Sequence, residues 1–180
     1  MAESSGEHFD GAAFRQTMGN FCSGIVIVTA NFEGAPVGFA AQSFVSLSLD
    51  PPLVAFCPGK SSSSWPKIRA SGGFCINILA ANQADVCATM AQPGTDKFAT
   101  VEWRDGLLGA PILAGVLAHI ECDLDAEHDA GDHTIAVGRV RHFESSQGQA
   151  QGQPLLYFRS QYGAFSEFTS AVVAKSEAVK

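Results

Sequence analysis

The stretch Gly38-Phe-Ala-Ala-Gln-Ser-Phe-Val-Ser-Leu-Ser-Leu-Asp-Pro-Pro52, followed by Cys57-Pro-Gly-Lys-Ser-Ser-Ser-Ser64, decides the fold of this chain. It predicts an extended segment, a turn at the two prolines, a buried strand over residues 53–57, and then a loop of small hydroxyl residues with one lysine. Along the extended segment, strict alternation places two serines on one face and three apolar residues on the other. The serines are Ser46 and Ser48, and the apolar residues are Val45, Leu47 and Leu49.

Small residues and hydroxyl groups in this stretch suit a flat ligand with a charged tail. Gly38, Ala40 and Ala41 let such a ligand lie against backbone amides. Lys60 and the four serines after it offer one charge and several hydrogen-bond donors to a phosphate, at the start of a predicted helix. These features fit a flavin. From spacing alone, an ordinary strand pair with a β-bulge and a solvated loop explain the same residues, and both alternatives stay open.

The rest of the chain predicts short helices and many strands. The first predicted helix is capped by Asp10 and carries Phe14, Met18 and Phe21 at helical spacing. The second is capped by Ser64, has Pro66 in its first turn and ends at Gly72 and Gly73. The third is capped by Asn82 and runs to Ala91. Strands are predicted over residues 25–29, 74–79, 116–126, 133–144 and 155–158, with turns over residues 31–36 and 128–132. The strand over residues 116–126 alternates between an apolar face and a mostly polar face.

This pattern favours a mainly β, closed or sandwiched domain over a parallel sheet, because strands do not alternate regularly with helices. The chain has 180 residues, of which 46% are hydrophobic and 16% charged, so one core can form without disulfide bonds. We expect a single domain over residues 1–180, with its core at about 10–168, a polar N-terminus and a flexible C-terminal tail of weak helical character.

Composition also excludes several classes of partner. The net charge of -7 and the pI of about 5.1 argue against a nucleic-acid backbone. The polar, acidic N-terminus is not a signal peptide, and no apolar run is long enough to span a membrane. Five cysteines without a C-x-x-C pair are expected to be reduced, mostly buried thiols of a cytoplasmic protein.

Four short motifs, in their order, resemble the short-chain flavin reductase family, the reductase components of two-component flavin monooxygenases. The motifs are Gly38-Phe-Ala-x-x-Ser-Phe, Ser46-x-Ser-x-x-Pro-Pro, Asp96-Lys-Phe98 and Gly131-Asp-His133, and the resemblance covers about residues 14–162. It implies a Greek-key split β-barrel of the FMN-binding type, with peripheral short helices. It also implies a homodimer with flavin sites near the subunit interface. Within the family, the chain resembles the reductase partners of actinobacterial steroid-degrading hydroxylases, which implies a role in aromatic or steroid catabolism.

The resemblance further implies which residues bind the cofactors. His133 is expected on the nicotinamide side of the flavin, as the catalytic residue, where it orients the carboxamide or stacks on the ring. Phosphate is expected at the Lys60 loop, and nicotinamide dinucleotide at Arg159 and Tyr162. The cofactor-binding residues expected are Gly38, Phe39, Ala40, Ala41, Gln42, Ser43, Phe44, Ser46, Leu47, Ser48, Cys57, Pro58, Lys60, Ser61, Ser62, Ser64, Lys97, Phe98, Arg159 and Tyr162. No metal is expected.

The reaction implied is reduction of free FMN or FAD by NADH or NADPH. Hydride would pass from nicotinamide C4 to flavin N5, a step that needs stacking and orientation but no protein acid or base. Reduced flavin would then diffuse to a separate flavin-dependent oxygenase, so the flavin should bind loosely. NADH is expected over NADPH, because the chain is acidic and lacks a clear arginine pair for a 2′-phosphate. We also expect a homodimer that covers apolar surface around Phe39, Phe44 and Trp103.

Other classes of function fit less well. A flavin-binding sensor or storage protein would need no nicotinamide pocket, and an oxidase of the pyridoxamine-phosphate type would need a cluster of basic residues for a second phosphate. Residues 128–133 hold two His and two Asp, but a tight turn spreads such side chains, so a polar turn is favoured over a metal site. Gly59-Lys60-Ser61 is not a P-loop, because Val54 stands where that motif needs glycine. The chain also lacks the G-x-S-x-G and G-x-G-x-x-G motifs.

Overall fold

The structure is a computed structural model that describes residues 9–94, 96–146 and 152–166. Strands dominate, as the sequence predicts. The helices are α1 (Gly11–Met18), α2 (Trp65–Ser71) and α3 (Ala84–Ala91). The strands are β1 (Ser23–Gly24), β2 (Val26–Phe32), β3 (Ala35–Ala41), β4 (Val45–Leu49), β5 (Pro52–Phe56), β6 (Gly73–Ile78), β7 (Trp103–Asp105), β8 (Pro111–Leu113), β9 (Ala118–Ala130), β10 (His133–Ser145), β11 (Leu155–Phe158) and β12 (Gln161–Ala164).

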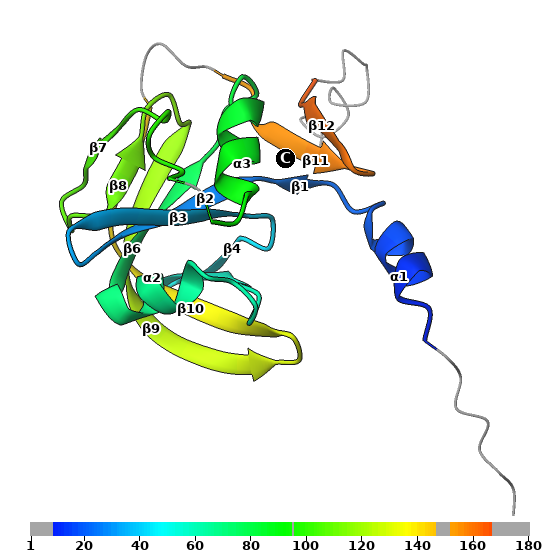
Figure 1. Cartoon of the computed structure of the whole chain (residues 1–180), viewed down its shortest axis with the longest axis horizontal. Coiled ribbons are helices and arrows are strands. Elements are labelled where there is room, and N and C mark those ends of the chain that lie inside the picture. The colour runs from blue at the N-terminus through cyan, green and yellow to red at the C-terminus, as the bar shows by residue number, and fades with distance from the viewer. Residues whose placement is uncertain (1–8, 95, 147–151, 167–180) are drawn as a thin grey trace, which may run out of the picture.

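Seven antiparallel strands form one curved sheet in the order β3-β2-β6-β9-β10-β5-β4 (Figure 1). The chain neighbours β5 and β6 do not pair, and α2 connects them across the end of the sheet. Trp65 and Ile68 of α2 are buried there, and the indole of Trp65 donates a hydrogen bond to Glu127 Oε1 at 3.1 Å. Within the described residues, no helix is long and apolar enough to cross a membrane.

Strand β2 is buried on both faces, which explains its unbroken β-branched sequence. Val26, Val28 and Ala30 pack in one core cluster with aromatic residues of β5 and β6. Ile25 and Ile27 belong to a second cluster, on the side that α3 covers. Strand β2 therefore separates the two parts of the core.

Two hairpin turns are tighter than the sequence predicts. Strands β2 and β3 are joined by Glu33 and Gly34 alone, both with positive φ (53° and 80°), where glycine carries no steric cost. Likewise, Ala130 pairs with His133, so only Gly131 and Asp132 form the turn between β9 and β10. The predicted turn over residues 128–132 is therefore wrong, because pairing continues to the two-residue turn.

The predicted helices form, but their caps differ in part. Asp10 accepts hydrogen bonds from the amides of Ala12 and Ala13 at 2.9 and 3.1 Å, which confirms the first cap. Ser64 stands at the start of α2, but its hydroxyl donates to Gly38 O instead, and Ser62 Oγ accepts from the Trp65 amide. Gln83 takes the position predicted for Asn82.

The extended segment over residues 38–49 is not continuous. It breaks after Ala41 into β3 and β4, and a bulge at Leu47 interrupts the pairing of β4 with β5. The strict alternation predicted for β4 is therefore wrong. The β5 strand itself begins at Pro52 and ends at Phe56, one residue earlier than predicted.

The mostly polar face predicted for the strand over residues 116–126 is partly buried in β9. His119 and Glu121 are 5% and 0% exposed. The β7–β8 hairpin, which the sequence does not predict, lies nearby, and its turn supplies amides to the Glu121 carboxylate. Leu107 N donates to Oε1 at 3.1 Å, and Leu108 N donates to Oε2 at 2.7 Å. The two amides satisfy a buried charge.

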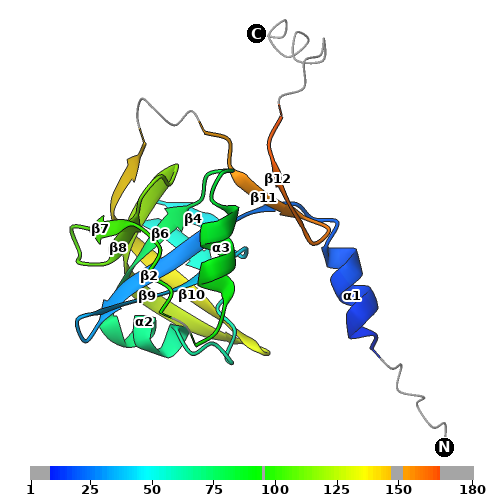
Figure 2. The ribbon, with the colours of Figure 1, turned by 45° about the horizontal axis from the view of Figure 1, so that its top comes forward.

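Helix α1 stands clear of the barrel body in both views (Figures 1 and 2). The β11–β12 hairpin is anchored to the body, because Leu155 of β11 is buried in one cluster with Leu79, Cys87 and Met90. Helix α1 has no buried residue, and its predicted apolar residues are largely exposed: Phe14 and Met18 by 52% each, and Phe21 by 76%. The predicted tail after Phe168 lies outside the described residues, as do residues 147–151 between β10 and β11.

Candidate functional site

Two pockets lie beside strand β3, and both are lined in part by the stretch Gly38–Ser64. We call the first the histidine pocket; it has a volume of about 460 Å³. It is lined by Phe39, Ala40, Ala41, Gln42, Ser43, Cys57, Pro58, Gly59 and His133. All of these except Gly59 are residues that the sequence analysis assigns to cofactor binding or catalysis.

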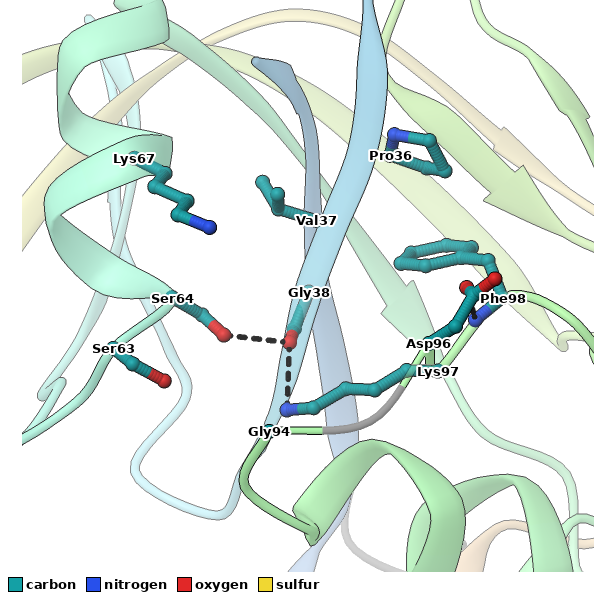
Figure 3. A pocket seen from close by; sticks show the side chains of 10 residues that line it. All are labelled: Pro36, Val37, Gly38, Ser63, Ser64, Lys67, Gly94, Asp96, Lys97 and Phe98. Atoms are coloured by element: carbon teal, nitrogen blue, oxygen red, sulfur yellow. Dashed lines mark hydrogen bonds between the residues drawn. The ribbon is translucent and has the colours of Figure 1, made fainter.

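We call the second the lysine pocket; it has a volume of about 280 Å³. It is lined by Pro36, Val37, Gly38, Ser63, Ser64, Lys67, Gly94, Asp96, Lys97 and Phe98. Figure 3 shows Ser63, Ser64 and Lys67 on one side of Gly38, while Lys97 reaches toward Gly38 from the other side. Two ammonium groups and two hydroxyl groups thus border one small space, together with the carboxylate of Asp96, and the four donor groups suit a phosphate.

The carbonyl oxygen of Gly38 joins the two sides of the lysine pocket. It accepts a hydrogen bond from Ser64 Oγ and another from Lys97 Nζ, both at 3.1 Å. Lys97 Nζ also donates to Met90 O at 2.9 Å, which leaves one of its three donors for a ligand. Burial lowers the pKa of Lys97, so a bound anion would restore favourable surroundings for its charge.

Strand β3 is an edge strand, and its free edge faces the pockets. Only β2 pairs with it in the seven-stranded sheet. Because the carbonyl of Gly38 points away from β2, toward Ser64 and Lys97, strand periodicity points the peptide groups of Ala40 the same way. These groups offer both a donor and an acceptor to the polar edge of a flat ligand.

His133 is held at the mouth of the histidine pocket. The tip of the β9–β10 hairpin is fixed to the loop after β5, since Lys60 N donates to Asp132 O at 2.9 Å and Thr134 N donates to Pro58 O at 3.0 Å. Gly59 lines the same pocket, and its Cα lies close to the imidazole: a methyl group added at Gly59 would lie 3.7 Å from Nε2 of His133. The imidazole therefore borders the pocket through its Nε2 side.

Asp132 sets the tautomer of that imidazole. Its Oδ1 lies 2.7 Å from His133 Nδ1. This contact lowers the pKa of Asp132, so the carboxylate stays ionised and accepts from Nδ1–H. In the neutral ring, Nε2 is then a hydrogen-bond acceptor that faces the pocket.

Lys60 does not line either pocket. Its ammonium forms a salt bridge with Asp129 of β9, and the pairing lowers the pKa of that carboxyl group. Ser62 is occupied in capping α2, and Ser61 lines neither pocket. The phosphate role of these three residues stays a prediction.

Other predicted site residues lie apart from the two pockets. Ser46, Leu47 and Ser48 belong to β4, at the opposite edge of the sheet order from β3. Phe44 packs partly buried against the core, together with Phe39, and Trp103 contacts Phe98 edge-on with ring centroids 6.0 Å apart. Of the expected apolar surface, Phe39 and Phe44 are partly covered within the chain, whereas Trp103 is 37% exposed, so only Trp103 of the three offers a largely open apolar ring.

Arg159 and Tyr162 lie on the β11–β12 hairpin. The Arg159 guanidinium donates to Asn20 Oδ1 at 2.9 and 2.7 Å, and Tyr162 Oη donates to Cys87 Sγ at 3.5 Å. Neither residue lines the histidine pocket or the lysine pocket. Their contact with the nicotinamide dinucleotide stays a prediction.

Some lining residues were not among the predicted site residues. The missed residues with polar side chains are Ser63, Lys67 and Asp96. Lys67 follows Ser64 by three residues, a helical spacing that puts both on one side of the first turn of α2 and that could have indicated it. The Asp96-Lys-Phe98 motif indicated this segment, but the contact of Lys97 with the Gly38 carbonyl depends on the folded chain.

Comparison with known proteins fits this geometry. Residues 18–166 match the family described as flavin reductase like domain. The reductase subunit HsaB of a flavin-dependent monooxygenase from Rhodococcus jostii is 49% identical over 156 residues, which span 87% of this chain and 78% of that protein.

Two solved structures are similar over nearly the whole fold. Nitrilotriacetate monooxygenase component B from Mycobacterium thermoresistibile has a TM-score of 0.85 and 46% identity, with 89% of each chain covered. The NADH:FAD oxidoreductase SgcE6 from Streptomyces globisporus, in complex with NAD and FAD fragments, has a TM-score of 0.83 and 32% identity, with 89% of this chain and 96% of that chain covered. The predicted split β-barrel is confirmed.

Proposed function

The chain belongs to the flavin reductase family, and from this premise we propose how its two pockets reduce a flavin with NAD(P)H. It is an NAD(P)H:flavin oxidoreductase and the reductase component for a separate flavin-dependent monooxygenase. By its likeness to HsaB and related proteins, we assign it to aromatic or steroid catabolism. The flavin and NADH supply the chemistry, transfer of hydride from nicotinamide C4 to flavin N5.

We place the ring of the flavin in the histidine pocket and its phosphate in the lysine pocket. The single observation that carries this placement is the carbonyl of Gly38, which fixes Ser64 and Lys97 beside β3 at the boundary between the two pockets. The ring edge would meet the outward peptide groups of Ala40. The phosphate would accept from Lys97, Lys67 and the serine hydroxyls.

His133 positions the nicotinamide in this proposal. With Nδ1–H committed to Asp132, its Nε2 accepts a hydrogen bond from the carboxamide of NADH. The contact holds the nicotinamide ring against the flavin, and the close approach of two stacked rings accounts for most of the rate. No protein group needs to donate or remove a proton in the hydride step.

We propose that the flavin is an exchangeable substrate and that reduced flavin reaches the oxygenase by diffusion. Both pockets lie beside the edge strand β3 and are partly open. Cytoplasmic location is part of this proposal, since free NADH and a partner oxygenase are found there. It agrees with the burial of three of the five free cysteines.

A second copy of this chain is the proposed cover for helix α1. An eight-residue helix without buried side chains is not stable in water by itself, and Phe14 and Met18 stand on one face at i, i+4 spacing. Exposed Val45, Leu47 and Leu49 on the edge strand β4 add further apolar surface. Closed two-fold pairing is the commonest way to bury such surface.

Light scattering tests this homodimer. We expect twice the chain mass at micromolar concentration, and a monomer for Phe14→Asp. Leu107→Asp changes an exposed apolar residue on another part of the surface and should leave the dimer intact. A wild-type protein with the mass of a single chain would contradict the proposed homodimer.

NADH oxidation with and without added flavin distinguishes the enzyme from a flavin-binding sensor or storage protein. We expect rapid oxidation only when FMN or FAD is present, with a rate that saturates in both flavin and NADH. Running all four pairings of FMN or FAD with NADH or NADPH gives the preference. A chain that binds flavin but leaves NADH unoxidised would favour the sensor.

A further inference from the structure

Three metal-ligating side chains gather at the open end of the β9–β10 hairpin, far from the flavin pockets. One nitrogen from each of His119 and His142 and one oxygen of Glu144 all lie within 4.8 Å of one another. In the sheet register, Glu144 lies directly opposite His119. A bulge after Val140 places His142 opposite Glu121, so that all three ligand groups share one face.

The two imidazole rings are suited to bind a metal ion. Neutral imidazole nitrogens are common ligands of transition-metal ions, and the side chain of His119 is held in a buried position, 5% exposed. The ring of His142 lies beside it, with centroids 5.9 Å apart. Among the described residues, no hydrogen bond or ion pair occupies the ligand atoms of His119, His142 or Glu144.

The balance of charge around the three side chains favours a cation. Glu144 supplies one negative charge, and the buried Glu121 lies on the same face. Arg104 opposes them, but it is exposed, and its guanidinium donates to the carbonyl of Asp105. A cavity of about 190 Å³ lies beside the cluster, lined by His119, Glu144 and Ser146 and also by Arg104, and it leaves room for water to complete the coordination.

We propose that His119, His142 and Glu144 bind one divalent transition-metal ion of the zinc class, with water as the remaining ligand. Two neutral imidazoles and a carboxylate are ligands that zinc and its neighbours accept. Strand β9 has 13 residues and is therefore roughly 40 Å long, and His133 lies past its other end. The ion joins two strands at the end of the sheet and takes no part in flavin reduction.

Zinc titration of the metal-free full chain, followed by calorimetry, tests this site. We expect one ion per chain for the wild type. His142→Ala and Glu144→Gln each remove one ligand and should weaken binding by at least about tenfold. Both side chains are at least partly exposed, so these variants should fold, whereas His119→Ala would empty a buried position. His128→Ala is the matched control, an exposed histidine on the same strand that should change nothing.

Cobalt absorption separates this site from zinc bound by the cysteines. Ligation by nitrogen and oxygen gives no thiolate-to-metal charge-transfer band, whereas a cysteine ligand does. The proposal stands if wild-type cobalt spectra lack that band and His142→Ala loses the bound ion. It is overturned if the wild type binds no zinc at a saturable site, if His142→Ala binds as the wild type does, or if the band is present.

Discussion

The ammonium of Lys97 donates a hydrogen bond to the carbonyl oxygen of Gly38 at 3.1 Å and so ties the loop after α3 to the edge strand β3. Ser64, from the start of α2, reaches the same carbonyl. Three segments distant in the sequence thereby meet at one atom. The lysine pocket exists because of this junction. Lys97 and Lys67 bring positive charge to its lining, and Asp96 adds one carboxylate.

Replacing Lys97 by methionine should weaken flavin binding. Loss of one charge-assisted contact to phosphate removes about 1.5 to 3 kcal/mol, which corresponds to roughly a tenfold to hundredfold rise in Kd. Because the phosphate lies away from the reacting ring, KM for flavin should rise more than kcat falls. Flavin titration followed by fluorescence measures the effect.

Lys60→Met is the matched control for that experiment, since the Lys60 ammonium is paired with Asp129 in this structure. We expect a smaller effect on flavin Kd than for Lys97→Met. If flavin Kd instead rises more in Lys60→Met than in Lys97→Met, the phosphate lies at the Lys60 loop, as the sequence alone predicts.

Substitution of His133 by alanine should impair the use of NADH. The carboxamide loses its acceptor at Nε2, so KM for NADH should rise while flavin Kd stays nearly constant. Asp132→Asn should have a weaker effect of the same kind, because the imidazole stays but no carboxylate holds its proton on Nδ1. Flavin binding that collapses in His133→Ala, with an unchanged KM for NADH, would contradict the assigned role.

Glu121 should contribute strongly to stability. In Glu121→Ala, the partly buried amides of Leu107 and Leu108 lose their acceptor, at a cost of about 1 to 3 kcal/mol in the free energy of unfolding. Urea unfolding at one fixed protein concentration measures this difference. Glu102→Ala, at an exposed position before β7, should change the free energy of unfolding by less than about 0.5 kcal/mol. Equal values for the two variants would show that the Glu121 contacts are unimportant.

Stability should fall in mild acid because of His119. Its pKa is lowered in the folded state, so the unfolded chain takes up the proton first as the pH falls below the ordinary value of 6.5. The contribution of His119 is therefore complete above that value and is lost as the pH falls toward the folded-state pKa.

The measurement is urea unfolding of the wild type and His119→Gln at about pH 7 and about pH 5.5, with a chelator present. The loss of free energy of unfolding should be larger for the wild type. An equal loss in both proteins would mean that His119 is protonated as readily in the folded chain as in the unfolded chain.

Periodicity predicted most of the fold, because strands with a buried face leave a clear pattern. The run over residues 155–158 became β11 at the same bounds, and the β-branched run before Thr29 became the doubly buried β2. Strands β7 and β8 have three residues each, which is too short to show an alternating pattern in the sequence. The sequence therefore could not predict that their turn covers Glu121. The bulge at Leu47 likewise depends on pairing with β5.

The candidate site was predicted where it is continuous in sequence. Residues 39–43 and 57–58 line the histidine pocket together with His133, as the motifs indicate. The lysine pocket combines β3, α2 and the loop around Asp96, and only the folded chain shows that Lys97 reaches Gly38 while Lys60 is held by Asp129. Charged residues near a site are thus identified by sequence, but their partners are set by tertiary contacts.

Anaerobic stopped-flow reduction of flavin tests the central claim most directly, because it observes hydride transfer without the oxygenase. Enzyme and flavin are mixed with NADH or with NADH carrying deuterium at the transferred position of C4, and the absorbance of oxidised flavin is followed. We predict full loss of that absorbance, slowed by the deuterium, and slower reduction at limiting NADH in His133→Ala. Flavin that stays oxidised in the presence of enzyme and excess NADH would contradict the account.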